Sequence, residues 1–497
     1  MKTLYELAKL NQKNARIVES MISVEKASPL KKLNDILIRN DQIDDYAAMV
    51  EIYGKKNISA FSRLKTRLKD ILIRSTLLQN VNIEAADSRL TESHNHLRYA
   101  LASKLMVDLR SRSLSMEIAE RAIVKAIKYS LTESIILFAR LLVIHFGGSE
   151  YNKYKLNKYL LIQNKYLRVY EYEIKAENYY YDLQRTQLQS LAVPSENTKE
   201  KAKRYVEELE AVNDIDSYFF ILNRYKVKSA FLEYQKDFDT LLKISDNILK
   251  EFGNEFKSAS FLQTISIRRL WSLIQAGRNT EAISAGIHDM SKIQSGSLGW
   301  YFIAHYTLKA QLYNGNYQQA TLLITQMIDN PKYLKIGENF KELFTTTLGY
   351  IHLAIESGIL GNPKEHQDHL PEFKIYRFLN AMPVFSKDKR GINVSILLMH
   401  IGYLLLRKDF DSIIDRTDSL NQYAYRYLRK DDSFRSNCMI KMVIQMTKAE
   451  FNPIRTERYT TDLLNQLKQV KLAGSGENIE TEIIPYEVLW EIMTKSL

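Results

Sequence analysis

The stretch GNYQQA, residues 315–320, lies between two segments of helical length in which apolar residues recur every three or four positions. Glycine permits a sharp turn, an aromatic residue follows two positions later, and a small alanine closes the stretch. Three other stretches share this layout of a short turn, an aromatic or polar residue, and a small or aliphatic one: KDFDTL at 236–241, GRNTEA at 277–282 and KDFDSI at 408–413. A fifth, AEFNPI at 449–454, fits less well because it contains Pro453. The pattern indicates a weak internal repeat from about residue 218 onward.

The closing residues of these stretches recur at a nearly constant interval. Leu241 and Ala282 are 41 residues apart, Ala282 and Ala320 are 38 apart, and Ile413 and Ile454 are again 41 apart. The 93 residues from Ala320 to Ile413 leave room for one irregular repeat with an insertion. A helix pair of this length cannot bury its apolar faces alone, and stacking on the next pair completes the burial.

These stretches resemble the tetratricopeptide repeat (TPR) family, which uses Gly-x-Tyr-x-x-Ala at the bend between its two helices. Gly315, Tyr317 and Ala320 match that pattern in full. The other three stretches match in part. Gly277 and Ala282 match without the aromatic, while Phe238 and Phe410 supply the aromatic without the glycine. The resemblance covers roughly residues 218–465. The repeat here is longer than the family's usual 34 residues, and the family's Trp-Leu-Gly signature is absent.

The composition agrees with an all-α protein. The chain has 497 residues, too many for one compact core, and 45% of them are hydrophobic. Only 17 glycines and 8 prolines occur, where average usage would give roughly 35 and 25. Scarce turn formers disfavour an all-β protein and a glycine-loop nucleotide-binding fold. We therefore predict an α-solenoid of stacked antiparallel helix pairs, TPR-like, with a less regular N-terminal helical region.

Four regions follow from the pattern along the chain. We expect an N-terminal helical unit at 1–90 and helical pairs without a clear repeat at 91–215. TPR-like repeats at 216–465 contain an irregular excursion at 360–392, which holds three of the eight prolines and a short helix from Phe373 to Asn380. Residues 466–497 form a C-terminal capping helix, because the aliphatic residues after Gly476 can cover the open face of the last pair.

The sequence argues against catalysis and against a membrane. Cys438 is the single cysteine, so no intrachain disulfide or multi-thiolate zinc site can form. No phosphate loop, nucleophile elbow or zinc-protease motif occurs. The longest apolar run, 134–146, is too short to cross a bilayer, and no signal peptide is visible. We expect a cytoplasmic protein that is not an enzyme, needs no cofactor and does not bind a membrane.

One group of side chains has the composition of a metal site. Glu365, His366, Asp368 and His369 lie between two prolines, where any helix is short. A solvated polar turn is the favoured interpretation, and no metal site is predicted.

The TPR resemblance implies a partner site on the concave face, which the first helix of each pair lines. The positions that map there are Arg268, Trp271, Gln275, Phe302, His305, Lys309 and Tyr313. Such a surface suits an extended or helical peptide with acidic and apolar side chains. The competing interpretation makes Trp271 a core residue that seals neighbouring repeats. The expected function is a protein–protein interaction scaffold or adaptor.

The basic charge supports a second hypothesis. The net charge is +12, and a basic amphipathic segment at 55–74 carries Arg63, Lys65, Arg67 and Lys69 beside an apolar stripe. These residues are either the solvated face of a packing helix or a nucleic-acid-binding helix. The alternative function is therefore a nucleic-acid-binding or regulatory protein, with a basic N-terminal helical unit and a repeat-built sensor.

Overall fold

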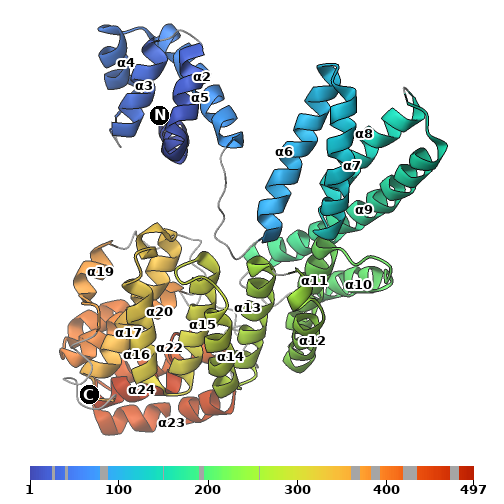
Figure 1. Cartoon of the computed structure of the whole chain (residues 1–497). Coiled ribbons are helices and arrows are strands. Elements are labelled where there is room, and N and C mark those ends of the chain that lie inside the picture. Colours follow the sequence, from blue (N-terminus) through green and yellow to red (C-terminus); the bar gives the residue numbers. More distant parts are fainter. Residues whose placement is uncertain are drawn as a thin grey trace.

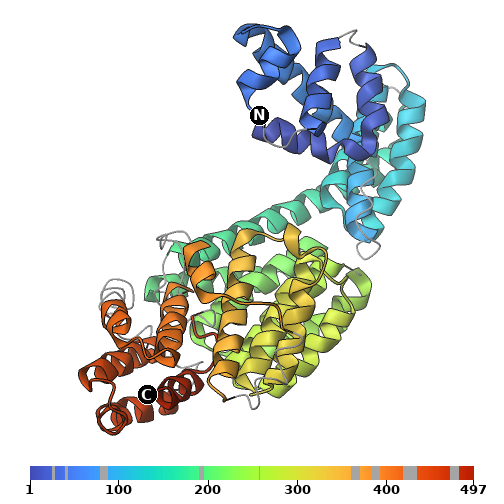
Figure 2. The ribbon, with the colours of Figure 1, turned by 90° about the vertical axis from the view of Figure 1, so that its left-hand side faces the viewer.

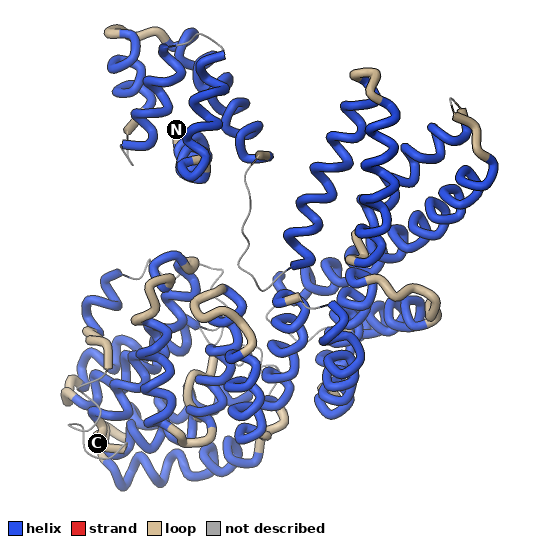
Figure 3. Tube along the Cα trace, in the orientation of Figure 1, coloured by secondary structure: helices blue, strands red, loops and turns tan. Residues whose placement is uncertain are grey.

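The computed structural model describes residues 1–24, 28–39, 43–78, 88–148, 150–189, 195–256, 258–359, 370–381, 392–417, 434–470 and 481–497. Within these ranges every regular element is a helix and no strand occurs (Figure 3). The predicted all-α class is confirmed. None of the described helices has the length and apolar character needed to cross a membrane.

The first helices form a bundle with a core of its own (Figure 1). They are α1 (Lys2–Leu10), α2 (Ala15–Val24), α3 (Ser28–Arg39), α4 (Asp45–Tyr53) and α5 (Ile58–Leu77). Leucines of α3 and α5 are fully buried between them, among them Leu33 and Leu68. The next helix, α6, begins at Ser88, so the predicted boundary at residue 90 falls inside a helix and the bundle ends with α5.

Four further helices pack in sequence order: α6 (Ser88–Asp108), α7 (Arg112–Lys128), α8 (Thr132–Gly147) and α9 (Lys153–Gln189). The last is one continuous helix of 37 residues, about 55 Å long, and it is prominent in Figure 2. Tyr159, in its first half, belongs to the core of α6–α8. Ala176 and Leu183, in its second half, belong to a different core shared with α10 (Glu196–Glu210) and α11 (Tyr218–Gln235). One helix therefore forms a wall of two cores.

The remaining helices share one large core that runs from Leu242 to Met493. They are α12 (Phe238–Phe256), α13 (Ala259–Gln275), α14 (Asn279–Ser291), α15 (Leu298–Tyr313), α16 (Tyr317–Ile328), α17 (Glu338–Glu356), α19 (Ile375–Ala381), α20 (Ile392–Leu406), α22 (Phe434–Lys448), α23 (Pro453–Gln469) and α24 (Tyr486–Lys495). Most contacts join consecutive helices, and α13 also contacts α15.

The four repeat stretches share one turn geometry. Each turn has a residue in the left-handed conformation, and the N–H of the next residue bonds to the carbonyl five positions earlier, as in a Schellman C-cap. The left-handed residues are Lys236, Gly277, Gly315 and Lys408, and the bonds are Asp237 to Leu232 (3.0 Å), Arg278 to Leu273 (2.8 Å), Asn316 to Gln311 (2.9 Å) and Asp409 to Leu404 (3.0 Å). The closing residues Leu241, Ala282, Ala320 and Ile413 are all fully buried. Two of the turns thus have a lysine in the left-handed conformation, and the other two have a glycine. The conformation is strained for lysine and not for glycine.

The fifth stretch has a different register, and the match of Ile454 to the closing position is wrong. Glu450 and Phe451 are both left-handed, so this turn is one residue longer than the others. Asn452 then caps α23, and Ile454 is 79% exposed. The buried residue four positions after the cap is Thr456.

The same turn also occurs earlier in the chain, where the sequence shows no clear repeat. Arg110 and Ser130 are left-handed, and the next N–H groups reach the carbonyls of Met106 (2.8 Å) and Ala126 (2.9 Å). The turns α6–α7 and α7–α8 therefore close in the way of the later ones. Their stretches carry neither the glycine nor the aromatic that marks the others.

One predicted boundary and the role of the last helix differ from the structure in the last part of the chain. Helix α23 continues to Gln469, so a boundary at 465 cuts it. Helix α24 contacts α17, α20, α22 and α23, and so covers more than the last pair. In the 360–392 excursion the short helix is α19, while residues 360–369 and 382–391 lie outside the described residues.

Candidate binding groove

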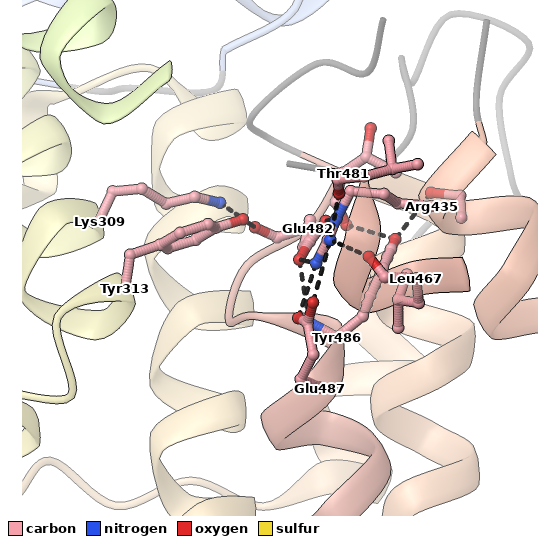
Figure 4. Close-up of polar contacts among 10 residues, drawn as sticks. Lys309, Tyr313, Arg435, Leu467, Thr481, Glu482, Tyr486 and Glu487 are labelled. Carbon is pink, nitrogen blue, oxygen red and sulfur yellow. Dashed lines mark hydrogen bonds and ion pairs between the residues drawn. The ribbon is translucent and has the colours of Figure 1, made fainter. Parts of the chain in front are cut away.

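Residues 481–497, here called the returning segment, lie against helices that are distant in sequence (Figure 4). Residues 481–485 are non-helical and lead into α24. The apolar side chains of the segment, including Ile483, Ile484 and Leu489, are almost completely buried. Helices from as far back as α15 thus contact this stretch of seventeen residues, of which Glu491 and Lys495 are exposed.

Two side chains of α15 hold the main chain of the returning segment. Lys309 Nζ and Tyr313 Oη both donate to the carbonyl oxygen of Glu482, the tyrosine at 2.8 Å. Lys309 is only 2% exposed, and its ammonium lies 5.3 Å from the centre of the Tyr313 ring. A cation buried to this degree needs an acceptor close by, and a backbone carbonyl supplies it.

A second main-chain contact comes from α20. Ser395 Oγ donates to the carbonyl of Thr481, and the Ser395 carbonyl accepts from Tyr350 Oη of α17 at 2.7 Å. The tyrosine helps to position Ser395, because it binds the carbonyl of the same residue whose hydroxyl contacts the segment. Two neighbouring carbonyls, those of Thr481 and Glu482, are therefore bonded by side chains from different helices.

Arg435 of α22 binds the side chain of Glu482. Its Nε and Nη2 donate to the two carboxylate oxygens at 2.9 and 2.7 Å. It also donates to Glu487 at 3.0 and 2.7 Å and to the carbonyls of Leu467 and Val470 at 3.0 and 2.8 Å. The guanidinium is 5% exposed, Glu482 is fully buried, and the Glu487 side chain is 29% exposed. Every N–H of the guanidinium has an acceptor, which is the condition for burying such a group.

The predicted partner-binding residues divide into two sets in the structure. Lys309 and Tyr313 meet at the Glu482 carbonyl as described, while Gln275 and His305 are buried. Gln275, His305 and Lys309 are all buried in this structure, so they are not exposed to solvent on the predicted concave face. Neighbouring helices and the returning segment enclose α15 on nearly all sides, so most of its residues are buried.

The other members of the predicted set lie in helix–helix contacts. Arg268 pairs with Glu233 of α11, and Trp271 packs edge-on against Phe238 with ring centres 5.3 Å apart. Phe302 makes a similar contact with Phe340 at 4.7 Å. These contacts agree with the competing interpretation, in which Trp271 seals neighbouring repeats.

His305 has no hydrogen-bond partner for either ring nitrogen among the described residues. Burial lowers its pKa to about 3, and the nearby Lys309 charge acts in the same direction. The imidazole is therefore neutral at physiological pH and packs as part of the core, 6.0 Å from the Phe344 ring centre.

Sequence reasoning missed Arg435, Glu482 and Glu487. A weak signal exists, since Arg435 and Glu482 each stand beside a run of apolar residues that is otherwise free of charge in its buried positions. The two residues are 47 positions apart in the sequence, so no local spacing indicates that they pair.

The basic residues of the alternative site lie on α5. Arg63, Arg67 and Lys69 are exposed. Lys65 instead pairs with Asp45 of α4, and this hydrogen bond, the largest effect on the carboxylate, lowers the pKa of Asp45. Three of the four predicted cations are therefore exposed, and Lys65 is partly buried.

Neither a metal centre nor a known relative adds to this description. The described part of the chain contains no group of three or more side chains suited to a metal ion, and Glu365, His366, Asp368 and His369 lie outside it. No protein-family model, curated protein or solved structure that was compared with this chain matches it.

Proposed function

We propose that this chain is a cytoplasmic interaction scaffold or adaptor, a TPR-like α-solenoid whose inner face holds a polypeptide segment and which catalyses no reaction. The recurrent turn and the packing of consecutive helices support the solenoid. In a solenoid the first helices of successive pairs line one continuous surface. Helices α15, α20 and α22, which hold the returning segment, are the members that line it here.

The observation that carries the proposal is the way the returning segment is held. Lys309, Tyr313 and Ser395 bind main-chain carbonyls, and Arg435 binds one carboxylate. Main-chain contacts give affinity that does not depend on side chains, whereas one charged contact and apolar pockets give selectivity. The groove therefore suits a segment with a glutamate followed by two branched aliphatic residues, as in Glu482-Ile483-Ile484.

The proposed partner is a protein segment of the same chemistry, which competes with the returning segment for this groove. The match to the acidic and apolar peptide expected from the sequence supports this choice. An intramolecular occupant has a high effective concentration, so a partner must bind tightly or meet a groove that opens locally.

The test exchanges the occupant. A protease site inserted within residues 471–480 allows the returning segment to be cut from an already folded chain. A fluorescent peptide with the sequence of residues 481–497 should then bind the cut protein, as measured by anisotropy, and should not bind the uncut protein. An unlabelled peptide should compete, and the same peptide with Ile483→Asp should not.

The control for charge recognition is a peptide with Glu482→Gln, which keeps the shape of the side chain. We expect it to bind at least tenfold more weakly, because charge-assisted hydrogen bonds contribute about 1.5–3 kcal/mol each. Failure of the labelled peptide to exchange unless the whole protein unfolds would show that residues 481–497 are a permanent part of the core, and would remove the support for a peptide groove at this place.

A further inference from the structure

Positive charge is concentrated in the first bundle. Residues 1–78 contain 15 Lys and Arg against 9 Asp and Glu, whereas the whole chain contains 70 against 58. Half of the excess positive charge therefore belongs to less than a sixth of the chain. An excess of this kind on a small helical unit favours an anionic ligand.

The bundle ends in a helix pair joined by a short fixed turn. Gly54 is left-handed at φ 68° and closes α4. Asn57 caps α5 by accepting from the Ala60 amide at 3.2 Å, and its own amide donates to Met49 Sδ. Lys55 and Lys56, between the two caps, are exposed. The turn thus holds two lysines at the start of α5.

Helix α5 separates apolar and basic side chains onto opposite faces. Phe61, Leu64 and Leu68 are buried in the bundle core. Arg63, Arg67 and Arg74 are exposed and lie at i, i+4 and i+11, so they follow one face over about 16 Å. Asp70 stands in the same row, and Lys69 is exposed at its side.

We propose that this face of α5, together with Lys55 and Lys56, is a binding site for double-stranded DNA. A helix of this width fits the major groove of a duplex, and arginines along one face reach phosphates on its rims. The four-residue turn places the two lysines immediately before the N-terminal end of α5. The proposed duplex contacts five cations of this site: Lys55, Lys56, Arg63, Arg67 and Arg74.

This site does not depend on the scaffold function. The bundle has its own core, and its basic face shares no residue with the groove of α15, α20 and α22. With both sites, the chain would hold a protein segment and a DNA duplex at once.

The test measures binding of the full chain to a fluorescent 30-base-pair duplex by anisotropy over a range of salt concentrations. Five phosphate contacts predict that log K falls with log salt at a slope of about −4.5. Arg63→Glu with Arg67→Glu should weaken binding at least tenfold and make the slope shallower by about two. Arg63→Gln with Arg67→Gln should act in the same direction without adding a negative charge beside Asp70.

The matched control is Arg458→Glu with Lys468→Glu, two exposed cations of α23 that give the same change in net charge. The control should bind duplex within about twofold of the unmodified chain, because salt screens charges beyond about 10 Å, and all variants should melt with it. The proposal is overturned if the unmodified chain does not bind duplex at about 50 mM salt. It is also overturned if the control loses as much affinity as the α5 variants, or if single strands of equal length bind as tightly as duplex.

Discussion

Replacement of Glu482 by glutamine tests whether the Arg435 network holds the returning segment in place. The amide keeps the shape of the side chain and one acceptor oxygen. It turns the other oxygen into an N–H group that faces the N–H donors of Arg435. One charge-assisted hydrogen bond is lost, and the guanidinium, 5% exposed, keeps Glu487 as its only carboxylate. We expect the segment to be destabilised by about 3 kcal/mol, near the lower end for breaking a buried pair.

The assay is native-state hydrogen exchange at the Tyr486 amide, which donates to the Glu482 carboxylate at 2.9 Å. Opening of the returning segment exposes this amide, so a loss of 3 kcal/mol should speed its exchange about a hundredfold. Local exchange is the right measure because a long helical array does not unfold in one step. Fluorescence of Trp490, which is buried on α24, provides a second signal from the same segment.

The matched control is Glu487→Gln. The Glu487 side chain is 29% exposed, so water replaces part of what it loses, and we expect about 1 kcal/mol or a fivefold change in exchange. The double change Arg435→Met with Glu482→Met should lower the stability of the segment by much less than the sum of the two single changes. Each single change leaves a buried charge without its partner, whereas the double change removes both charges. The reasoning is refuted if Glu482→Gln and Glu487→Gln change the exchange of the Tyr486 amide equally.

Three further predictions concern the core and the turns. Ala320→Leu should lower stability by about 1–3 kcal/mol, measured by denaturant midpoint, because Ala320 is fully buried where helices cross; an unchanged midpoint would mean that the position tolerates bulk. Lys236→Gly should raise the free energy of unfolding by about 1 kcal/mol and Gly315→Ala should lower it by about the same amount, since both positions are left-handed; both changes are measured as shifts in melting temperature. A Cβ at Gly315 meets no atom within 4 Å, so the effect there comes from the backbone conformation and not from a clash. His305 has a pKa lowered to about 3 in the folded chain against about 6.5 when unfolded, so its contribution is complete above pH 6.5 and is lost as the pH falls toward 3. At pH 5 protonation of His305 on unfolding should lower the free energy of unfolding by about 2 kcal/mol relative to neutral pH. His305→Leu should therefore reduce the fall in stability between pH 7 and pH 5; an equally steep fall in the variant would contradict this.

The sequence predicts the local structure well because local rules govern it. Helical periodicity places the helices, and the glycines at 277 and 315 mark turns that the structure closes in one way. The turns that contain Lys236 and Lys408 are marked in the sequence by the aromatic residues Phe238 and Phe410. The prediction that Ile454 is the buried closing residue was wrong, because nothing in the composition of this stretch indicates that Phe451 takes a left-handed conformation. Arg110 and Ser130 carry no signal for the same reason.

The candidate site depends on contacts between distant residues, and these have no period to detect. Lys309 has the spacing of a groove residue on α15, but its burial is decided by Glu482, 173 residues later. The apolar residues after 482 predict a closing element, and most of them are buried in the structure. The sequence does not predict which helices they cover, because tertiary packing decides where α24 lies.

The continuous helix α9 fixes the phase between the two cores that it joins. Each added residue advances a helix by about 1.5 Å and turns it by about 100°. One residue inserted near Arg168, between Tyr159 and Ala176, would rotate the apolar side chains of one half away from their core while the other half stayed in place. Seven inserted residues make almost two full turns and would keep both halves within about 20° of their partners. We therefore expect α9 to tolerate only insertions or deletions that amount to nearly whole helical turns.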